Sequence, residues 1–216
     1  MTNLSPDTII SRIITLMIAF TVHEFSHAWV ANAFGDDTPR ANGRLSLNPA
    51  VHLDLLGTLM LLFAGFGWAK PVPVNPYVLK RRSPAALMLV SLAGPLSNFV
   101  LAVLAAIPLR FGLIPAVYNW PGFLPTPYSF LLNFMVINIL LMLFNLIPLS
   151  PLDGEKVLEY FLPPAGVDFL DRIRPYSPLI LLGIVFILPI LGFDLFGMIL
   201  NPLLRAISSL LLGVSL

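Results

Sequence analysis

The feature that most constrains the fold is a histidine–glutamate motif inside a long apolar run. Residues 9–34 are predominantly apolar, yet residues 23–27 within them read His-Glu-Phe-Ser-His. An ionisable side chain at the centre of a membrane helix costs about 3 kcal/mol, so such residues persist mainly where they face a bundle interior and serve a function. The run therefore predicts a transmembrane helix that carries a polar site.

The spacing within this motif indicates a metal site. Side chains four residues apart lie on one face of a helix, so His23 and His27 can bind one zinc ion while Glu24 reaches a water molecule as a base. The whole chain of 216 residues contains only 3 His, which makes a chance match to this pattern rare. A pair of buried histidines satisfied by neighbouring polar groups is the alternative, and the specificity of the match argues against it.

Composition independently predicts a membrane protein. Hydrophobic residues make up 57% of the chain and charged residues 11%, against about 45–50% and 25% in soluble domains. The net charge of +1 gives no basis for nucleic-acid binding. The absence of cysteine excludes disulfides, thiolate zinc ligands and a cysteine nucleophile. Histidine and carboxylate side chains remain as metal ligands.

Several apolar stretches are long enough to cross a bilayer, and they set the predicted fold. We expect an all-α membrane protein, a polytopic helix bundle of about five to six transmembrane segments. It forms a single integral-membrane domain over residues 1–216, with a catalytic core at about 9–160 and C-terminal helices at about 177–216. The predicted spans are residues 9–34, 84–109, 128–149, 177–193 and 195–214.

One further apolar stretch, residues 55–66, is too short to cross. The prolines that follow it, within residues 69–76, forbid helix and favour an extended backbone. Non-helical chain at membrane depth is tolerated only where it is buried in protein or lines a watery cavity. We therefore predict a re-entrant or β-hairpin-like segment at residues 55–76 that borders the site, with a surface linker as the alternative.

The distribution of basic residues predicts the orientation. If residues 55–66 do not cross, most lysines and arginines fall on one side of the membrane, while Arg12 and Arg110 alone lie near the loops of the other side. The basic side is expected to be cytoplasmic. This places the N-terminus outside, the C-terminus inside after five spans, and the active site toward the cytoplasmic face of a cell membrane.

A zinc peptidase site needs a third protein ligand and leaves the fourth position for water. Asp153 is the strongest candidate, because it follows the span at 128–149 after two helix-breaking prolines, and Gly154 permits a tight turn. An N-cap role for Asp153 is the alternative. Asp36 and Asp37 are more simply explained as loop acids, whereas His52 and Asp54 could be supporting or capping residues as easily as ligands, and Glu155 places a second carboxylate beside Asp153.

Three separated motifs together resemble the short form of the site-2 protease family of intramembrane zinc metalloproteases. They are the His-Glu motif at 23–27, Ser-Leu-Ala-Gly-Pro-Leu-Ser-Asn at 91–98, and the region from Asn-Leu-Ile-Pro at 145–148 to Leu-Asp-Gly at 152–154. Residues 70–76, Lys-Pro-Val-Pro-Val-Asn-Pro, also resemble a segment of this subgroup. Glu155 departs from many relatives, which have a small or neutral residue there, and no stretch is long and polar enough for an inserted PDZ domain.

This resemblance implies a site and an activity. One Zn²⁺ per chain would be bound by His23, His27 and Asp153, with Glu24 as the catalytic base. Asn145 would assist substrate or transition-state binding, and Asn98 is carried over as a further substrate-binding residue.

The implied activity is hydrolysis of peptide bonds in or near transmembrane segments of membrane proteins, as in regulated intramembrane proteolysis. The partners would be a transmembrane protein or peptide substrate and the lipid bilayer, with no oligomeric state predicted. Two alternatives are a membrane metal transporter, which would need polar groups across the whole membrane, and a non-catalytic membrane scaffold, which would not need Glu24.

Overall fold

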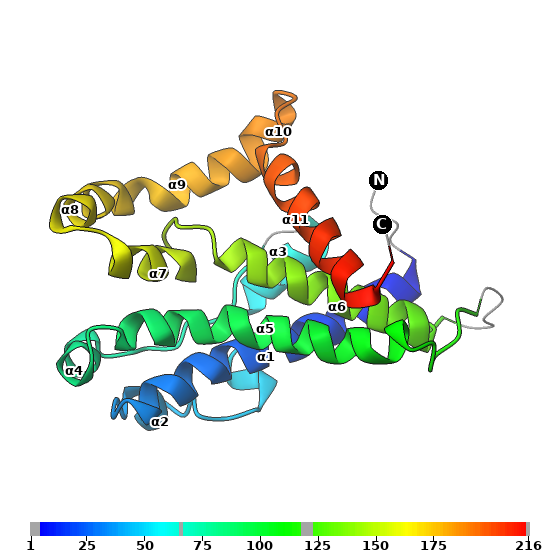
Figure 1. Ribbon diagram of the computed structural model, residues 1–216, viewed down its shortest axis with the longest axis horizontal. Coiled ribbons are helices and arrows are strands. Elements are labelled where there is room, and N and C mark those ends of the chain that lie inside the picture. Colours follow the sequence, from blue (N-terminus) through cyan, green and yellow to red (C-terminus); the bar gives the residue numbers. More distant parts are fainter. Residues whose placement is uncertain (1–4, 65–66, 118–122, 215–216) are drawn as a thin grey trace.

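Three long helices lie side by side and form the body of the molecule (Figure 1). The computed structural model describes residues 5–64, 67–117 and 123–214. The long helices are α1 (Pro6–Ala33), α5 (Ala86–Arg110) and α6 (Pro127–Asn145). Helix α6 ends four residues before the predicted boundary, because Pro148 and Pro151 follow it and cannot continue a helix. The all-α prediction is confirmed, and no regular strand occurs in the described ranges.

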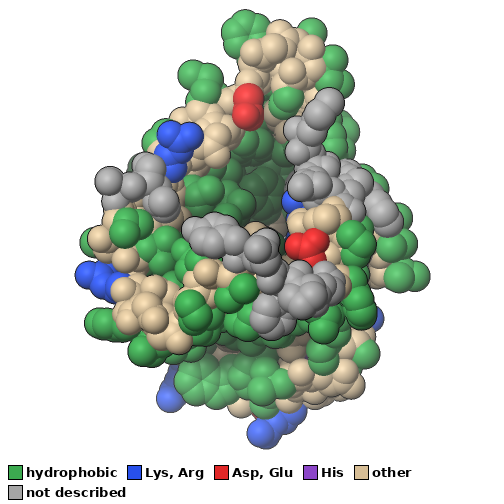
Figure 2. Space-filling view, turned by 90° about the vertical axis from the view of Figure 1, so that its right-hand side faces the viewer, with side chains coloured by type: hydrophobic (Ala, Val, Ile, Leu, Met, Phe, Trp, Pro, Cys, Tyr) green, Lys and Arg blue, Asp and Glu red, His purple; other side chains and the backbone are tan. Residues whose placement is uncertain are grey.

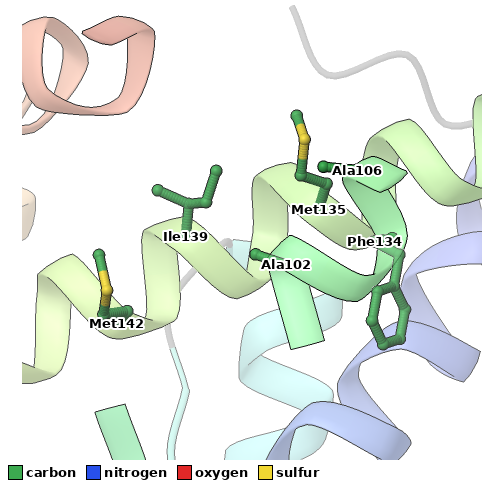
Figure 3. Close-up of a cluster of buried hydrophobic side chains, with 7 residues drawn as sticks. Ala102, Ala106, Phe134, Met135, Ile139 and Met142 are labelled. Atoms are coloured by element: carbon green, nitrogen blue, oxygen red, sulfur yellow. The ribbon is translucent and has the colours of Figure 1, made fainter. Parts of the chain in front are cut away.

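The apolar core of the bundle lies between α5 and α6 (Figure 3). Alanines on α5 face larger side chains on α6, and this pairing lets the two helices approach closely. In lipid, such close packing replaces the hydrophobic effect as the force between helices. The buried residues of this cluster are Ala102, Ala105, Ala106, Phe134, Met135, Ile139 and Met142.

The segment between α1 and α5 does not cross the bundle. It contains α2 (Thr38–Ala41), η1 (Pro49–Val51), α3 (Leu55–Ala64) and α4 (Pro76–Arg82). Helix α3 has 10 residues, which at ~1.5 Å per residue is about half of the hydrocarbon thickness. An isolated antiparallel bridge joins Leu53 to Ala69 across it. The predicted hairpin-like segment is thus a short helix followed by non-helical chain, and its residues 65 and 66 lie outside the described part.

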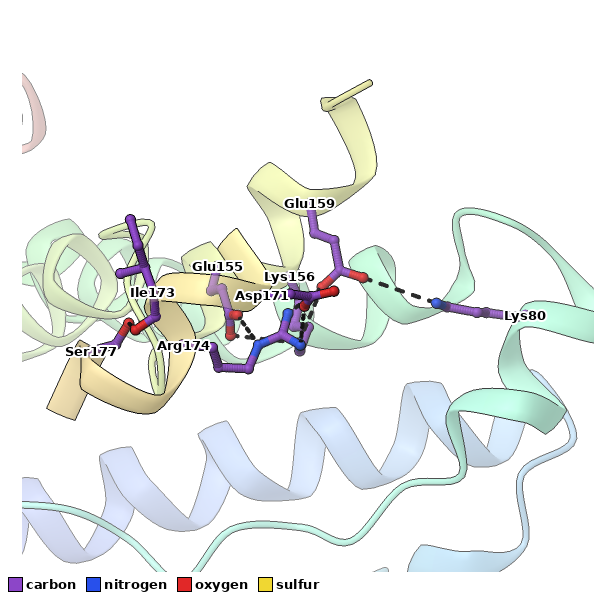
Figure 4. Close-up of polar contacts among 8 residues, drawn as sticks. All are labelled: Lys80, Glu155, Lys156, Glu159, Asp171, Ile173, Arg174 and Ser177. Atoms are coloured by element: carbon purple, nitrogen blue, oxygen red, sulfur yellow. Dashed lines mark hydrogen bonds and ion pairs between the residues drawn. The ribbon is translucent and has the colours of Figure 1, made fainter. Parts of the chain in front are cut away.

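A charge network fixes α7 (Asp153–Phe161) to the short helices around it (Figure 4). Arg174 of η2 (Arg174–Tyr176), which follows α8 (Pro164–Ile173), lies 2.5 Å from the buried carboxylate of Glu155 and 3.0 Å from Glu159. Lys80 of α4 reaches Glu159 at 4.0 Å. This places α7 beside the start of α5.

Glu159 is ionised more readily than an ordinary glutamate. Its partial burial disfavours the charge, but the hydrogen bond from Lys156 and the charges of Lys156, Arg174 and Lys80 outweigh it, so the pKa of Glu159 lies below its usual value. A lowered pKa means that the contribution of Glu159 to stability is present near neutral pH and is lost as the pH falls through that pKa.

The C-terminal region forms an arm beside the bundle. It consists of α9 (Ser177–Leu182), the π-helical turn η3 (Gly183–Ile187), α10 (Leu188–Ile190) and α11 (Leu195–Leu212). Counted with α8–α10 as one, five helices in the described ranges are long and apolar enough to cross a membrane, as the sequence predicts. Figure 2 shows the end of the molecule that lies on the right in Figure 1, where hydrophobic side chains are spread over the surface with few charged side chains among them.

The end of α11 does not lie at the metal end of the bundle, where the count of spans from the sequence places the C-terminus; which side of the membrane is cytoplasmic stays a prediction. Arg110, at the far end of α5, donates hydrogen bonds to the carbonyls of Leu210 and Leu211, so α11 ends at the opposite end of the bundle from α7. The sequence argument assumed that each apolar segment crosses fully and reverses direction. Instead, α9–α10 and α11 together carry the chain once from one end of the bundle to the other.

Candidate metal centre

Two helices bring three potential metal ligands together inside the bundle. The Nε2 atoms of His23 and His27, both on α1, lie 3.2 and 3.3 Å from Oδ2 of Asp153, the first residue of α7. Both histidines are buried and Asp153 is nearly so. This is the metal-ligand group found among the described residues, and it consists of the three ligands predicted from the sequence.

The distances in this group suit a tetrahedral metal. Nitrogen and oxygen ligands bind zinc at ~2.0–2.1 Å, so two such ligands at the tetrahedral angle lie about 3.3 Å apart. Oδ2 of Asp153 is buried without a hydrogen-bond partner, which is the state of an atom prepared for a metal. A metal held here would bind the ionised carboxylate of Asp153 and the neutral imidazoles of the two histidines.

Hydrogen bonds to the second ring nitrogens orient both imidazoles. Nδ1 of His23 lies 2.6 Å from Oδ1 of Asn98, and Nδ1 of His27 lies 2.7 Å from the carbonyl oxygen of Val90. Both acceptors belong to α5. Because each Nδ1 donates to oxygen, each Nε2 is left as the unprotonated atom that binds metal.

Two glycines allow the close approaches on which the cluster depends. A Cβ added to Gly94 of α5 would lie 2.6 Å from Nε2 of His23 and closer still to Nε2 of His27. A Cβ added to Gly154 would collide with the carbonyls of Leu146 and Ile147. Gly94 therefore leaves the space that the metal requires, and Gly154 lets the start of α7 pack against the loop after α6.

Glu24 lies in a cavity that opens beside the three ligands. Its side chain is 8% exposed, and its Oε2 accepts a hydrogen bond of 3.2 Å from the backbone N–H of Val72. The cavity has a volume of about 390 Å³ and is lined by the metal-ligand group, Glu24, the non-helical chain around Val72 and the ends of α6 and α5. A base, three ligands and a space for a substrate thus share one site.

Comparison with known proteins identifies the chain's family. The profile of peptidase family M50 matches residues 11–115. "Putative zinc metalloprotease YwhC" of Bacillus subtilis (strain 168) is 40% identical over 192 residues, which cover 87% of this chain and 84% of that protein. The chain belongs to peptidase family M50.

Other relatives agree with this M50 assignment. "Putative zinc metalloprotease Rip2" of Mycobacterium tuberculosis (strain ATCC 25618 / H37Rv) is 34% identical over 191 residues, covering 85% of this chain and 69% of that protein. No solved structure shows a significant similarity to the chain. The M50 match, the ligand group and the apolar helices together make the chain a multi-pass membrane zinc metalloprotease, in place of the transporter and the scaffold.

The two asparagines predicted for this M50 peptidase occupy different places. Asn98 is fully buried; besides meeting His23, its Nδ2 donates 2.9 Å to Oδ1 of Asn138. These contacts favour a role in orienting His23, and substrate binding by Asn98 stays a prediction. Asn145 does line the cavity, with its Nδ2 donating 3.0 Å to the carbonyl of Leu141. Its role in substrate binding also stays a prediction.

Sequence reasoning missed Asn138, which is fully buried on α6. Its Nδ2 donates to the carbonyl of Phe134 at 2.8 Å, so its Oδ1 is turned toward Asn98. The signal was present, since an amide inside a charge-free apolar span must find a partner.

Three other residues considered as the third ligand make hydrogen bonds or ion pairs away from the metal-ligand group. Glu155 is paired with Arg174, and Asp54 accepts the N–H of Gly57 at the start of α3. Nε2 of His52 lies 2.6 Å from the carbonyl of Ser46. None of these three joins the metal-ligand group of the described residues.

Proposed function

We propose that this M50 peptidase hydrolyses peptide bonds in or near the transmembrane segments of membrane-protein substrates. The observation that carries the proposal is the position of the site: His23, His27 and Glu24 are buried in the later half of a 28-residue apolar helix. A site at this place meets a substrate that lies in or close to the bilayer.

The side chains supply the parts of a metal-assisted hydrolysis. Zinc, when held by the two histidines and Asp153, polarises a peptide carbonyl and makes a water molecule more acidic. Glu24 accepts the proton of the attacking water and delivers it to the leaving amine. The Val72 N–H bond to Oε2 fixes the direction of this carboxylate. Asn145, at the cavity wall, is placed to donate a hydrogen bond to the oxyanion once its bond to Leu141 is released.

A transmembrane substrate must lose its helical structure before it can react, because its carbonyls are already hydrogen-bonded. The non-helical chain of residues 68–75 borders the cavity and offers an edge for main-chain pairing with an unwound substrate. The backbone N–H of Val74 has no hydrogen-bond partner among the described residues. Pairing of the substrate with this edge would present its carbonyl to the metal and Glu24.

Charge supports a site that faces the cytoplasm of a cell membrane. The last turn of α4, at the metal end of the bundle, carries Lys80, Arg81 and Arg82. At the opposite end, Arg110 is bonded to carbonyls of α11. Lysine and arginine in short loops favour the cytoplasmic side.

The test uses the purified chain in lipid nanodiscs with a candidate single-span substrate tagged at both ends. Mass spectrometry identifies the fragments, and elemental analysis measures zinc in the same sample. Cleavage within or beside the apolar segment, lost in Glu24→Gln and after zinc chelation, is the expected result. Cleavage confined to soluble, flexible peptides, with intact transmembrane substrates, would contradict the proposal.

A further inference from the structure

We infer that Asp36 and Arg44 are positioning residues that hold residues 70–75 across the cavity beside Glu24. Neither residue reaches the metal-ligand group, and the family comparison gives neither a role. The inference concerns the edge that the proposed function uses, and its catalytic part rests on that function. Its structural part rests on contacts at the two ends of the segment.

Asp36 anchors the C-terminal end of the segment. Its side chain is 1% exposed, and its Oδ2 accepts a hydrogen bond of 2.6 Å from the backbone N–H of Asn75. Its Oδ1 accepts the N–H of Thr38 at 3.0 Å. No basic side chain lies within ion-pair distance of it in the described part of the chain. A buried carboxylate is costly unless its oxygens are satisfied, and here backbone N–H groups satisfy both.

Asp36 also ties the segment to the helix that carries the site. It lies three residues beyond the end of α1, and its own N–H donates to the carbonyl of Ala31 at 3.0 Å. The left-handed backbone of Gly35, with φ of 87°, turns the chain so that the carboxylate points back at Asn75. These hydrogen bonds therefore attach the edge directly to α1, the helix that carries the two histidines and Glu24.

Arg44 anchors the other end. The residue is 6% exposed, and its Nη1 donates to the carbonyls of Val51 and of Lys70, the latter at 3.1 Å. The N–H of Lys70 in turn donates to the carbonyl of His52 at 2.8 Å. No carboxylate pairs with Arg44 among the residues described. Burying a cation is costly unless polar groups satisfy it, and one of the two carbonyls that Arg44 binds, that of Lys70, belongs to this edge.

The middle of the segment depends on these anchors. Val72, whose N–H meets Glu24, lies between Lys70 and Asn75. Pro71 and Pro73 have no N–H to donate, so the two ends supply most of the main-chain bonds. If either end were released, Val72 would move away from Glu24, and a substrate would have to order the segment as it bound.

A merely local role for Asp36, as a turn residue for α2, is the competing explanation, since it also binds the N–H of Thr38. That explanation predicts a change around residues 38–41 and none at residues 69–76. For Arg44, the corresponding local role is support of the carbonyl of Val51.

The experiment compares Asp36→Ala and Arg44→Ala with the neighbouring exposed residues as matched controls, Asp37→Ala and Arg40→Ala. Conservative variants, Asp36→Asn and Arg44→Lys, each keep one group able to make the observed bond. Full-length protein in nanodiscs is examined by hydrogen exchange and mass spectrometry. The amides of Val72 and Asn75, which are hydrogen-bonded to Glu24 and Asp36, report on the edge, and α5 reports on the whole fold. Zinc content, kcat and KM for the tagged substrate are measured on the same samples.

The two alanine variants are expected to exchange at least about 10-fold faster at residues 72–75, with α5 and zinc unchanged. We expect kcat/KM to fall about 10–100-fold, with Asp36→Asn and Arg44→Lys recovering part of the loss. The inference is overturned if exchange at residues 72–75 matches the controls, or if α5 exchange and zinc content change together with it in the conservative variants as well. The exchange result does not need catalysis, so it stands apart from any failure of the proposed protease function.

Discussion

Oδ1 of Asn98 lies 2.6 Å from Nδ1 of His23. This contact joins a residue in the middle of α5 to the first metal ligand on α1, and Asn98 is fixed in turn by Asn138 of α6. The three long helices are thus connected by one buried line of polar groups that ends at His23, a candidate metal ligand. Substitutions of these asparagines are expected to change the zinc affinity although neither asparagine is a metal ligand.

Replacement of Asn98 by alanine should weaken zinc binding about 10–100-fold, because His23 would lose the acceptor that fixes its ring orientation. A chelator titration measures the effect. Ser97→Ala is the control, since within the described ranges the hydroxyl of Ser97 donates to the carbonyl of Gly94 on its own helix. Equal zinc affinity in Asn98→Ala and Ser97→Ala would show that Asn98 does not orient the ligand.

Glu24→Gln should retain zinc and lose activity by about 10²–10⁴-fold, because the base is removed while the ligands stay. Glu159→Gln, a glutamate outside the metal cavity, serves as the control and should remain active. Turnover by Glu24→Gln within ten-fold of the unchanged protein would be incompatible with a base at this position.

Asp153→Ala should lose zinc and activity together, because it removes one of three ligands. Glu155→Ala, two residues along the same helix, should keep zinc but melt at a lower temperature, because Arg174 would lose its buried partner. Elemental analysis and a thermal-shift measurement separate these effects. The assignment of the third ligand fails if the Glu155 variant, and not the Asp153 variant, is the one that empties of zinc.

Gly94→Ala should abolish zinc binding while the protein still inserts into membranes. The added methyl group would meet Nε2 of both histidines, and neither backbone can withdraw without separating α1 from α5. Gly183→Ala adds a methyl group where nothing lies within 4 Å and should behave like the unchanged chain. Retention of full zinc content by Gly94→Ala would mean that the helices are further apart than described here.

A cysteine-free chain allows a direct test of the C-terminal arm. Single cysteines at Val214 and Leu113 should be labelled from the same side of the membrane, and one at Tyr77 from the other side. All three side chains are well exposed. Labelling of Val214 together with Tyr77 would restore the topology expected from the sequence and contradict the placement of α11.

The sequence was sufficient for the parts of the site that follow from local rules. The i, i+4 spacing of His23 and His27 determines their common face, and the prolines after α6 explain why Asp153 is free to turn back. The residues that contact the site from distant segments could not be predicted in this way. Val72 meets Glu24 only because a distant segment is folded across it, and a backbone N–H leaves no trace in a sequence.

The positions of the last helices could not be predicted from the sequence, for a related reason. Hydropathy reports that a segment is apolar enough for lipid but does not report its direction. The contact that settles the direction of α11 is between Arg110 and two backbone carbonyls about a hundred residues away. Counting spans treats all apolar segments as equivalent, whereas this contact places the end of α11 beside the far end of α5.

The prolines at positions 71 and 73 also bear on how the reaction ends. A neighbouring strand paired with this segment could form only part of the usual ladder, because two of the donors are missing. After the bond is cut, each fragment would be held by few main-chain bonds and could regain its helical form in the lipid. A sparse ladder therefore favours rapid release of hydrophobic products, which a fully paired edge would retain.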